Sequence, residues 1–439
     1  MIQVSATRDN GSNMWSLMER LFPLHRTLVG PGITESLHII RDYLPIDITE
    51  FPSGQKAFDW VIPKAFKVNE VYVEAPDGSR PIDFNKCNYH VWNYSIPFRG
   101  EMTREELLKH VATDPRLPDA VPLRDSYYKP RWGLSASQQQ VAALPEGTYK
   151  VVVDTELYDD YLRIGEYYLP GEVEDELLFS TYLCHPMGAN DNLSGVVLAV
   201  ELFKMLEKTP NRRFSYRLII IPETIGSIVY IANYPDRIKK TKGGFSVSFT
   251  GDPGSFNYKR TWQGDTFIDR AAIHALKHSG KTFQVRNYRQ GGSDERQFNA
   301  PKLRIPFGLI TRTPSTEYTR YHTNLDDMSF VTFDALLESL EIYCSTVAVI
   351  ERNRIYEPHY IAEPFMSGHG VYPYDLGAGT GDKSSQIDAI VQSFYDLIGD
   401  VDSRSDLLSI ADRRNLPITL MDRAVSDFLR AGLISEVRS

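Results

Sequence analysis

A histidine and an aspartate lie close together between a predicted strand and a predicted helix. The segment 184–195 reads Cys-His-Pro-Met-Gly-Ala-Asn-Asp-Asn-Leu-Ser-Gly and contains His185 and Asp191. Residues 177–183 are apolar and β-prone, as in a strand covered on both faces, and residues 192–208 repeat apolar side chains at helical spacing. Open α/β sheets bind ligands at the carboxyl ends of their strands. The spacing therefore predicts a metal site at this edge.

Two further predicted strands end near residues of matching chemistry. Pro222 and then Glu223 follow a predicted central strand over 216–221. His322 lies between a predicted strand over 305–310 and a long helix expected over 332–353. Neutral imidazole and carboxylate groups bind Zn²⁺, and a hydrolytic zinc site leaves one position open for water beside a carboxylate that accepts its proton. One sheet edge is thus expected to gather the residue types of a hydrolytic zinc site.

The order and content of four motifs resemble the di-zinc aminopeptidase family, which also contains the glutaminyl cyclases. The motifs are His-Pro followed by Asn-Asp-Asn-Leu-Ser-Gly, Pro-Glu-Thr-Ile-Gly, Ser-Asp-Glu-Arg-Gln-Phe and Tyr-His-Thr-Asn-Leu-Asp, and the similarity spans roughly residues 177–353. The resemblance implies that His185 and His322 are metal ligands, that Asp191 bridges two metals in the complete family site, and that Glu223 is the general base. It also implies an α/β fold with a zinc-aminopeptidase-like three-layer core and a mixed, mainly parallel sheet.

The chain departs from the family pattern at two ligand positions. Thr224 stands where the family has a second glutamate, and a hydroxyl does not replace a carboxylate ligand. After the predicted strand 244–250 the nearest acid is Asp252, a few positions later than the family's other aspartate ligand. The remaining three ligands match the arrangement of a catalytic zinc with an open position, and we expect one zinc per chain. These ligands are His185, Asp191 and His322.

Several of these acidic residues have a structural interpretation as well. Asp191 is a suitable helix cap, with or without a metal, and Glu223 is a suitable first-turn acid that the helix dipole favours. Asp294 and Glu295 fit a helix start or a substrate contact equally well. A free amino group on a substrate needs a carboxylate such as Glu295 or Glu317. Asp252 stays open as an additional metal contact.

Composition and charge narrow the class of protein. The 439 residues are 42% hydrophobic, which supports a sizeable core in two or three domains. With 48 basic and 57 acidic residues the net charge is −9, which argues against nucleic acid as the main partner. The three cysteines, Cys87, Cys184 and Cys344, are widely spaced, so we expect neither a disulfide framework nor a cysteine zinc site. Residues 1–13 are polar and no run of 18 apolar residues occurs, so a cytoplasmic protein without a membrane span is expected.

Changes in pattern along the chain predict several regions. Two helices are expected between residues 13 and 44, interrupted near Pro31 and with Thr34 as the cap of the second. An aromatic and basic loop at 127–133 belongs either to the core of an inserted domain or to a lid over the active cleft. The predicted regions are N-terminal helices of the catalytic core (1–50), an inserted β-rich domain (51–171), the aminopeptidase-like catalytic core (172–356), a linker (357–382) and a winged-helix-like domain (383–439).

The predicted C-terminal domain has three helical segments, 386–397, 405–415 and 420–432, and a short strand near its end. Such a winged helix commonly binds DNA, with its third helix in the major groove. Residues 382–439, however, contain seven Lys or Arg against ten Asp or Glu, and phosphate binding needs cations. Protein contact or homo-oligomerisation is therefore the favoured role for this domain.

The sequence as a whole favours a zinc-dependent exopeptidase that hydrolyses a small peptide or amide in an aminopeptidase-type reaction. A metal-activated water is the expected nucleophile, with Glu223 as the proton shuttle. Two alternatives stay open. One is acyl transfer of the glutaminyl-cyclase type, which an assay with a glutaminyl peptide separates from hydrolysis. The other is a catalytically inactive ligand-binding or scaffold protein, which Thr224 favours and Glu223 opposes.

Overall fold

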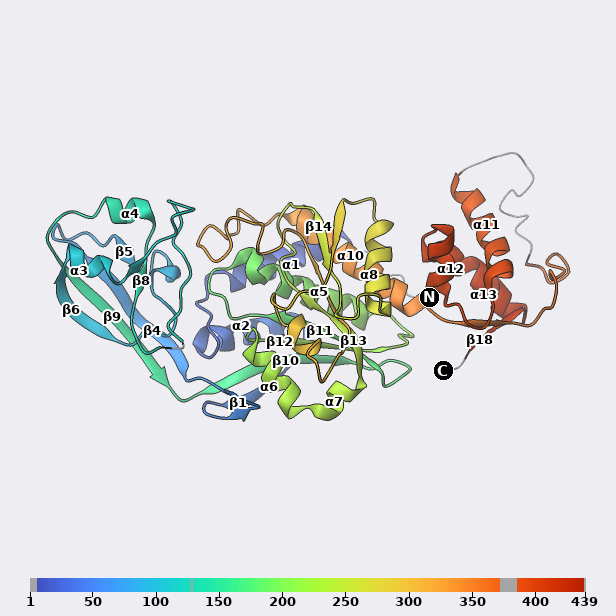
Figure 1. Cartoon of the computed structure of the whole chain (residues 1–439), viewed down its shortest axis with the longest axis horizontal. Coiled ribbons are helices and arrows are strands. Elements are labelled where there is room, and N and C mark those ends of the chain that lie inside the picture. The colour runs from blue at the N-terminus through green and yellow to red at the C-terminus, as the bar shows by residue number, and fades with distance from the viewer. Residues whose placement is uncertain (1–5, 128, 372–384, 438–439) are drawn as a thin grey trace.

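An eight-stranded mixed sheet forms the centre of the molecule in this computed structural model, which describes residues 6–127, 129–371 and 385–437 (Figure 1). Its four middle strands are parallel, and antiparallel pairs flank them on both sides. The parallel centre agrees with the expected α/β fold. In spatial order the strands are β1 (Asp47–Pro52), β10 (Tyr161–Leu169), β12 (Ser215–Ile221), β11 (Glu176–Tyr182), β13 (Thr241–Val247), β16 (Phe307–Thr311), β14 (Phe256–Lys259) and β15 (Phe283–Arg286).

Helices cover both faces of the sheet, and this explains why its central strands are apolar throughout. Every residue of β11 is buried, and Leu177 and Phe179 pack into one core while Leu178 packs into the other. The first core contains α1 (Arg8–Leu21), α2 (Pro31–Tyr43), α5 (Ser194–Glu207), α8 (Phe267–Lys277) and α10 (Phe333–Arg352). The second contains α6 (Ile225–Asn233), α7 (Pro235–Lys240) and α9 (Glu295–Phe298). In the part of the chain that the structure describes, no helix combines the length and apolar composition needed to cross a membrane.

The second N-terminal helix begins earlier than expected. Its cap is Gly30, Pro31 is the first helical residue, and Thr34 lies within the first turn, where its hydroxyl donates to the Gly30 carbonyl at 3.0 Å. The prediction of Thr34 as the cap was therefore wrong. Proline fits the first helical position because its missing N–H would have no partner there.

The inserted β-rich region has a sheet and a core of its own. The sheet has the order β5 (Ile82–Asp83), β4 (Ala65–Glu74), β9 (Thr148–Tyr158) and β6 (Phe98–Thr103). Shorter elements accompany it: the pairs β2 (Lys56–Ala57) with β3 (Trp60–Val61) and β7 (Val111–Ala112) with β8 (Leu134–Ser135), and the helices α3 (Arg104–Leu108) and α4 (Gln138–Ala142). This region lies at one end of the elongated molecule (Figure 1).

The structure differs from the predicted boundary of the insert at both ends. β1 and β10 pair with each other, and β10 pairs with β12, so both strands belong to the main sheet. The alternation of apolar and polar residues in the sequence does not show which sheet a strand joins. Within the insert, Trp132 stacks between Phe98 and His110, which places this part of the 127–133 loop in the insert's core.

Three helices and a two-stranded sheet form the C-terminal region, at the opposite end of the molecule from the insert (Figure 1). The helices are α11 (Ser385–Asp400), α12 (Leu407–Arg414) and α13 (Asp422–Arg430), and β17 (Tyr356–Pro358) pairs with β18 (Ile434–Glu436). The three helices and the final strand agree with the predicted segments, whereas the winged-helix assignment stays a prediction. The part of the predicted linker between 372 and 382 lies outside the described residues.

Ion pairs join this region to helices that pack on the main sheet. Arg270 on α8 donates two 2.8 Å bonds to the Asp406 carboxylate, and His274 lies 2.7 Å from Asp412. Arg352, at the end of α10, pairs with Asp422 at 2.9 Å. Burial raises the pKa of Asp406, but hydrogen bonds from Arg270 and neighbouring groups outweigh burial and hold that pKa below its usual value.

Replacing Asp406 by Asn is expected to destabilise the protein by roughly 1–3 kcal/mol near neutral pH, because hydrogen bonds to a charged group are lost. The folded-state pKa is lowered, so this contribution is complete above the unfolded pKa of about 3.9 and declines as the pH falls through the folded pKa. Denaturant unfolding of the wild type and the variant between pH 7 and pH 2 measures this contribution. The control is Asp42→Asn, which removes a carboxylate from an exposed ion pair with Arg20. A wild-type advantage that stays constant down to pH 2 would contradict the prediction.

Candidate metal centre and active site

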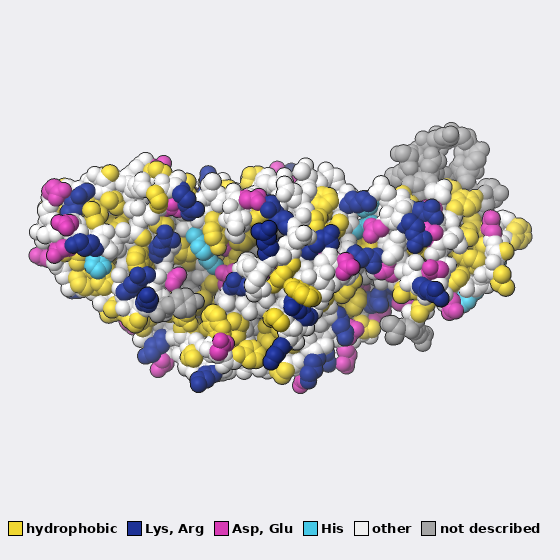
Figure 2. Space-filling view, in the orientation of Figure 1, with side chains coloured by type: hydrophobic (Ala, Val, Ile, Leu, Met, Phe, Trp, Pro, Cys, Tyr) yellow, Lys and Arg dark blue, Asp and Glu magenta, His cyan; other side chains and the backbone are white. Residues whose placement is uncertain are grey.

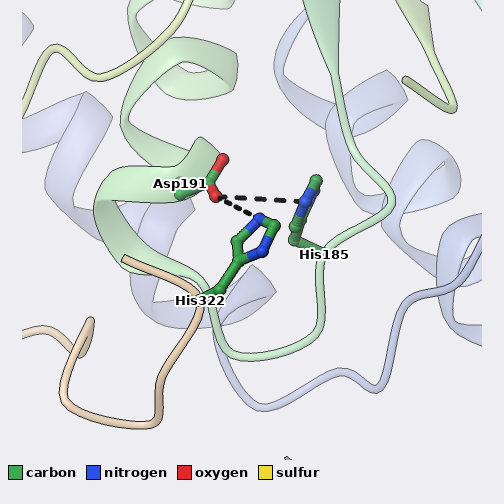
Figure 3. A group of neighbouring side chains, drawn as sticks. All are labelled: His185, Asp191 and His322. Carbon is green, nitrogen blue, oxygen red and sulfur yellow. Dashed lines mark ion pairs between the residues drawn. The ribbon is translucent and has the colours of Figure 1, made fainter. Parts of the chain in front are cut away.

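Three predicted ligands converge at the carboxyl edge of the sheet (Figure 3). His185 lies in the loop after β11, and His322 lies in the long loop after β16. Asp191 stands in an irregular turn, Ala189–Leu193, that leads into α5, and the peptide bond after it is cis. Figure 3 shows both imidazole rings directed toward the Asp191 carboxylate. The parallel strands β11 and β16 thus bring together residues that are far apart in the sequence.

The distances and the unpaired atoms of this group fit a metal ion. The Asp191 Oδ2 atom lies 3.3 Å from His322 Nε2 and 3.9 Å from His185 Nε2, and the three ligand atoms lie within 4.8 Å of one another. Ligands about 2.1 Å from a tetrahedral zinc are separated by about 3.4 Å. Asp191 Oδ2 and His322 Nε2 are buried atoms that have no hydrogen-bond partner among the described residues. Buried polar atoms without partners are costly, and a cation bound at this point would satisfy both of them.

The protonation states of the group also suit metal binding. Burial lowers the pKa of His185 to about 4, so its imidazole is neutral at pH 7 and offers a lone pair. Burial raises the pKa of Asp191, but the two histidines and the Tyr182 hydroxyl outweigh burial and hold it below its usual value. The Tyr182 hydroxyl donates to Asp191 Oδ1 at 2.6 Å. Asp191 is therefore an anion with one oxygen fixed and the other directed toward the histidines.

Residues outside the predicted set hold the ligand loops in place. The buried Asp326 carboxylate accepts the backbone N–H groups of Asn190 at 2.8 Å and Asp191 at 2.9 Å. Burial, with the nearby Asp191 charge, raises the pKa of Asp326 to about 8. The fully buried Arg26 donates from Nε to the His185 carbonyl at 3.1 Å. Asp326 ends the Tyr-His-Thr-Asn-Leu-Asp motif, so the sequence contained a signal for it, whereas nothing local pointed to Arg26.

The inserted β-rich region contacts the loop that bears His322. The Leu123 N–H donates to the His322 carbonyl at 2.7 Å, and the Asn324 side chain accepts from the Val121 N–H at the same distance. His322 itself has a positive φ of 56°. A non-glycine residue in this conformation needs support from its surroundings, which the insert supplies here. The insert therefore helps to position a candidate metal ligand.

Glu223 lies beside the candidate metal ligands, just after the end of β12. Thr224, with φ 65° and ψ −68°, forms a tight γ-turn closed by the Ile225 N–H and the Glu223 carbonyl at 2.7 Å. One Glu223 carboxylate oxygen is 3.9 Å from His185 Nε2, and a quarter of the side chain is exposed. Burial first, and then the charges of Asp294 and Asp191, raise the pKa of Glu223 well above its usual value. These surroundings suit a carboxylate that accepts a proton next to a metal.

Two of the additional predicted contacts are held by backbone and hydroxyl groups near the site. Asp252 is buried and accepts from the Asn190 amide at 3.1 Å and from Thr313. Asp294 accepts the Thr224 N–H at 2.8 Å and the Ser227 hydroxyl at 2.7 Å. Neither carboxylate belongs to the group of three potential ligands.

The other two predicted contacts are paired with cations. Glu295 is fully buried and lies 2.8 Å from the Lys259 ammonium. Glu317 is exposed and pairs with Arg286 at 2.7 Å. Thr224, at the position of the family's second glutamate ligand, accepts a hydrogen bond from Arg296 at 2.6 Å. Within the described residues, His185, Asp191 and His322 form the one group of three or more potential metal ligands.

The three-layer arrangement of a mainly parallel sheet, with these ligands at its carboxyl edge, defines a protein of the aminopeptidase-like fold. Residues 15–353 match the family described as "Domain of unknown function (DUF4910)", and the chain belongs to this family. The chain is also 35% identical over 435 residues to a Clostridium acetobutylicum protein named "Putative polysaccharide biosynthesis protein with aminopeptidase-like domain". That similarity covers 99% of this chain and 98% of the relative.

Two solved structures show how far the likeness in fold extends. A "putative peptidase" from Clostridium acetobutylicum has a TM-score of 0.90 and 34% identity, covering 98% of this chain and 97% of the other. A zinc aminopeptidase from Bacillus subtilis has a TM-score of 0.56 and 15% identity, covering 79% of this chain and 95% of the other. At that identity the second similarity shows the fold alone. The expected resemblance to zinc aminopeptidases is confirmed at the level of the fold.

Proposed function

We propose that this protein is a zinc-dependent exopeptidase that hydrolyses a small peptide or amide in an aminopeptidase-type reaction. The observation that carries the proposal is the position of Glu223, whose carboxylate lies 3.9 Å from a histidine of the candidate metal group and has a raised pKa. The aminopeptidase-like fold supports the same reaction class. We place the activity in the cytoplasm, because Cys87, Cys184 and Cys344 are all unpaired, as is usual for proteins of reducing compartments.

His185, Asp191 and His322 would hold the zinc ion, which when bound polarises the scissile carbonyl and lowers the pKa of a water molecule. Glu223 accepts the proton of the attacking water and delivers it to the leaving nitrogen. Asp326 keeps the turn around Asp191 in place by accepting two of its N–H groups. The proposal thus assigns proton transfer to Glu223 and ligand positioning to Asp326.

The test is hydrolysis of a panel of aminoacyl amides and dipeptides by the purified protein before and after chelation. We expect the protein to release free amine from at least one substrate. Chelation should abolish this release, and added zinc should restore it. Cyclisation of a glutaminyl peptide without net hydrolysis would favour acyl transfer instead. No turnover of any substrate by the zinc-loaded protein would favour a ligand-binding or scaffold role, to which the departure at Thr224 already points.

We further propose that the C-terminal region contacts protein, either a partner or a second copy of the chain. Acidic and basic side chains are interspersed over this region on the face shown in Figure 2. On α13, Arg430 lies 2.7 Å and Arg423 lies 3.6 Å from Asp427, so neither cation is available for phosphate without breaking a pair.

Removal of residues 382–439 is expected to change the oligomeric state or the solubility and to leave duplex DNA affinity as low as in the full chain. Size-exclusion chromatography with light scattering and a DNA titration at low salt measure the two properties. Tight, salt-sensitive DNA binding by the full chain that the truncation abolishes would contradict this prediction.

A further inference from the structure

Arg296 brings a positive charge next to the proposed general base. It stands in the short helix α9, and its Nη2 atom donates to the Thr224 hydroxyl at 2.6 Å, one residue after Glu223. Burial raises the pKa of Glu223, and the Arg296 charge opposes that rise. The same charge acts on Tyr321, whose ring stacks on His322 with centroids 3.8 Å apart. The hydrogen bond to Thr224 therefore places the guanidinium close to the proposed base.

This guanidinium forms no ion pair with a carboxylate of the described residues. Among the residues that the structure describes, no Asp or Glu oxygen lies within 4.0 Å of Arg296, and its side chain is partly exposed. Of the neighbouring carboxylates, Glu295 pairs with Lys259, and Asp294 accepts from the Thr224 N–H and the Ser227 hydroxyl. Glu223 feels the Arg296 charge but forms no ion pair with it within 4.0 Å. A guanidinium carries five N–H donors, and the bond to Thr224 uses one. Unused donors of a charged group remain for a ligand that enters the site.

At the guanidinium itself, the positive charge of Arg296 favours an anionic ligand over an ammonium group. The two carboxylates that the sequence offered for a free amino group, Glu295 and Glu317, are each paired with a cation. An ammonium group beside Arg296 would meet a like charge, whereas a carboxylate can accept two parallel N–H bonds from a guanidinium. Thr224 holds the guanidinium in place without neutralising it, because a hydroxyl carries no charge.

We propose that Arg296 binds a carboxylate of the substrate, so that the preferred substrates are small peptides or amides with a carboxylate on a residue next to the scissile bond. The hydrolytic part rests on the proposed function, whereas binding of the carboxylate does not require turnover. A single charge-assisted hydrogen bond strengthens binding by about 10- to 100-fold, and we expect a preference of this order.

The experiment compares the zinc-loaded wild type with Arg296→Gln and Arg296→Lys on three matched substrates. These are alanyl-alanine amide, alanyl-alanine with its free carboxylate, and glutamyl-alanine amide. Wild-type kcat/KM is expected to be about 10- to 100-fold higher for at least one carboxylate substrate than for the neutral amide. Arg296→Gln should reduce this ratio to near one, mainly through KM, and Arg296→Lys should keep part of it. The matched control is Arg289→Gln, an exposed arginine on a neighbouring loop.

The outcomes separate this inference from the proposed function. If the wild type and Arg296→Gln both hydrolyse the substrates with the same carboxylate preference, the role of Arg296 is overturned. The same conclusion follows if neither protein prefers a carboxylate. In both cases the hydrolase proposal still stands. If the wild type hydrolyses none of the three, the hydrolase proposal fails, and calorimetric titration with glutarate decides the binding role. Binding that Arg296→Gln weakens at least tenfold and Arg289→Gln leaves unchanged supports the inference. Equal binding by all variants, or none by the wild type, overturns it. Zinc content and thermal unfolding of each variant show whether the fold is intact.

Discussion

Replacing Glu223 by Gln is expected to lower turnover by about 10²- to 10⁴-fold while zinc content stays near that of the wild type. The amide keeps the size of the side chain but does not accept a proton, and positioned general-base catalysis contributes a factor of this order. Glu223 is not one of the three converging ligands, so metal affinity should change little. Steady-state kinetics and elemental analysis on the same preparation measure both quantities.

A matched control for this substitution is Glu317→Gln. Glu317 is an acid that the sequence also suggested, but it is exposed and paired with Arg286. Its replacement should leave kcat within a few-fold of the wild type. If Glu223→Gln keeps full activity with its zinc in place, then Glu223 is only a residue of the strand-to-helix turn, and the proposed proton transfer must be abandoned.

Metal analysis is expected to find at most one tightly held zinc per chain, and His322→Ala should lose that zinc together with activity. One zinc is expected because the described residues contain a single suitable group, and Thr224 supplies a hydroxyl where a second metal would need a carboxylate. Removing one of three protein ligands leaves too few donors for a stable catalytic site. Elemental analysis after dialysis, and activity with and without added zinc, test both statements.

The control for the ligand variant is His38→Ala, which removes an exposed histidine of α2. It should keep its zinc and its activity. Two tightly bound equivalents in the wild type would refute the single-metal argument and would require a second ligand group around Asp252 or Glu317. Full zinc retention by His322→Ala would show that His322 is not a ligand.

The sequence by itself predicted the elements that present the candidate site. The strand expected at 216–221 is β12, Ser215–Ile221, and the helix expected at 332–353 is α10, Phe333–Arg352. In these elements the spacing of the apolar residues indicates the type of secondary structure. The carboxyl ends of parallel strands meet at one edge of a sheet. His185, Asp191, Glu223 and His322 could therefore be placed together before any contact between them was known.

The residues that hold the candidate ligand loops in place could be identified only from the tertiary structure. The contacts of Arg26 with the His185 carbonyl and of Leu123 with the His322 carbonyl join segments more than a hundred residues apart. The assignment of β10 to the main sheet likewise follows from its ladder with β12. A backbone carbonyl can accept a hydrogen bond from many donors, and a strand can pair with many other strands. The periodicity and spacing of the sequence therefore do not identify the partner that the fold selects.

The three-dimensional packing also determines which charged side chains near the site form ion pairs. Glu295, Arg296 and Glu317 all lie in polar segments whose residue types suit several roles. The fold pairs Glu295 with Lys259 and Glu317 with Arg286, and it leaves Arg296 beside Thr224 without an ion pair to any carboxylate of the described residues. Electrostatic interactions depend on the separation of charges in space, which sequence order does not determine. The sequence therefore determined which residues can perform chemistry at this edge, and the tertiary structure decided which of their charges remain available to a ligand.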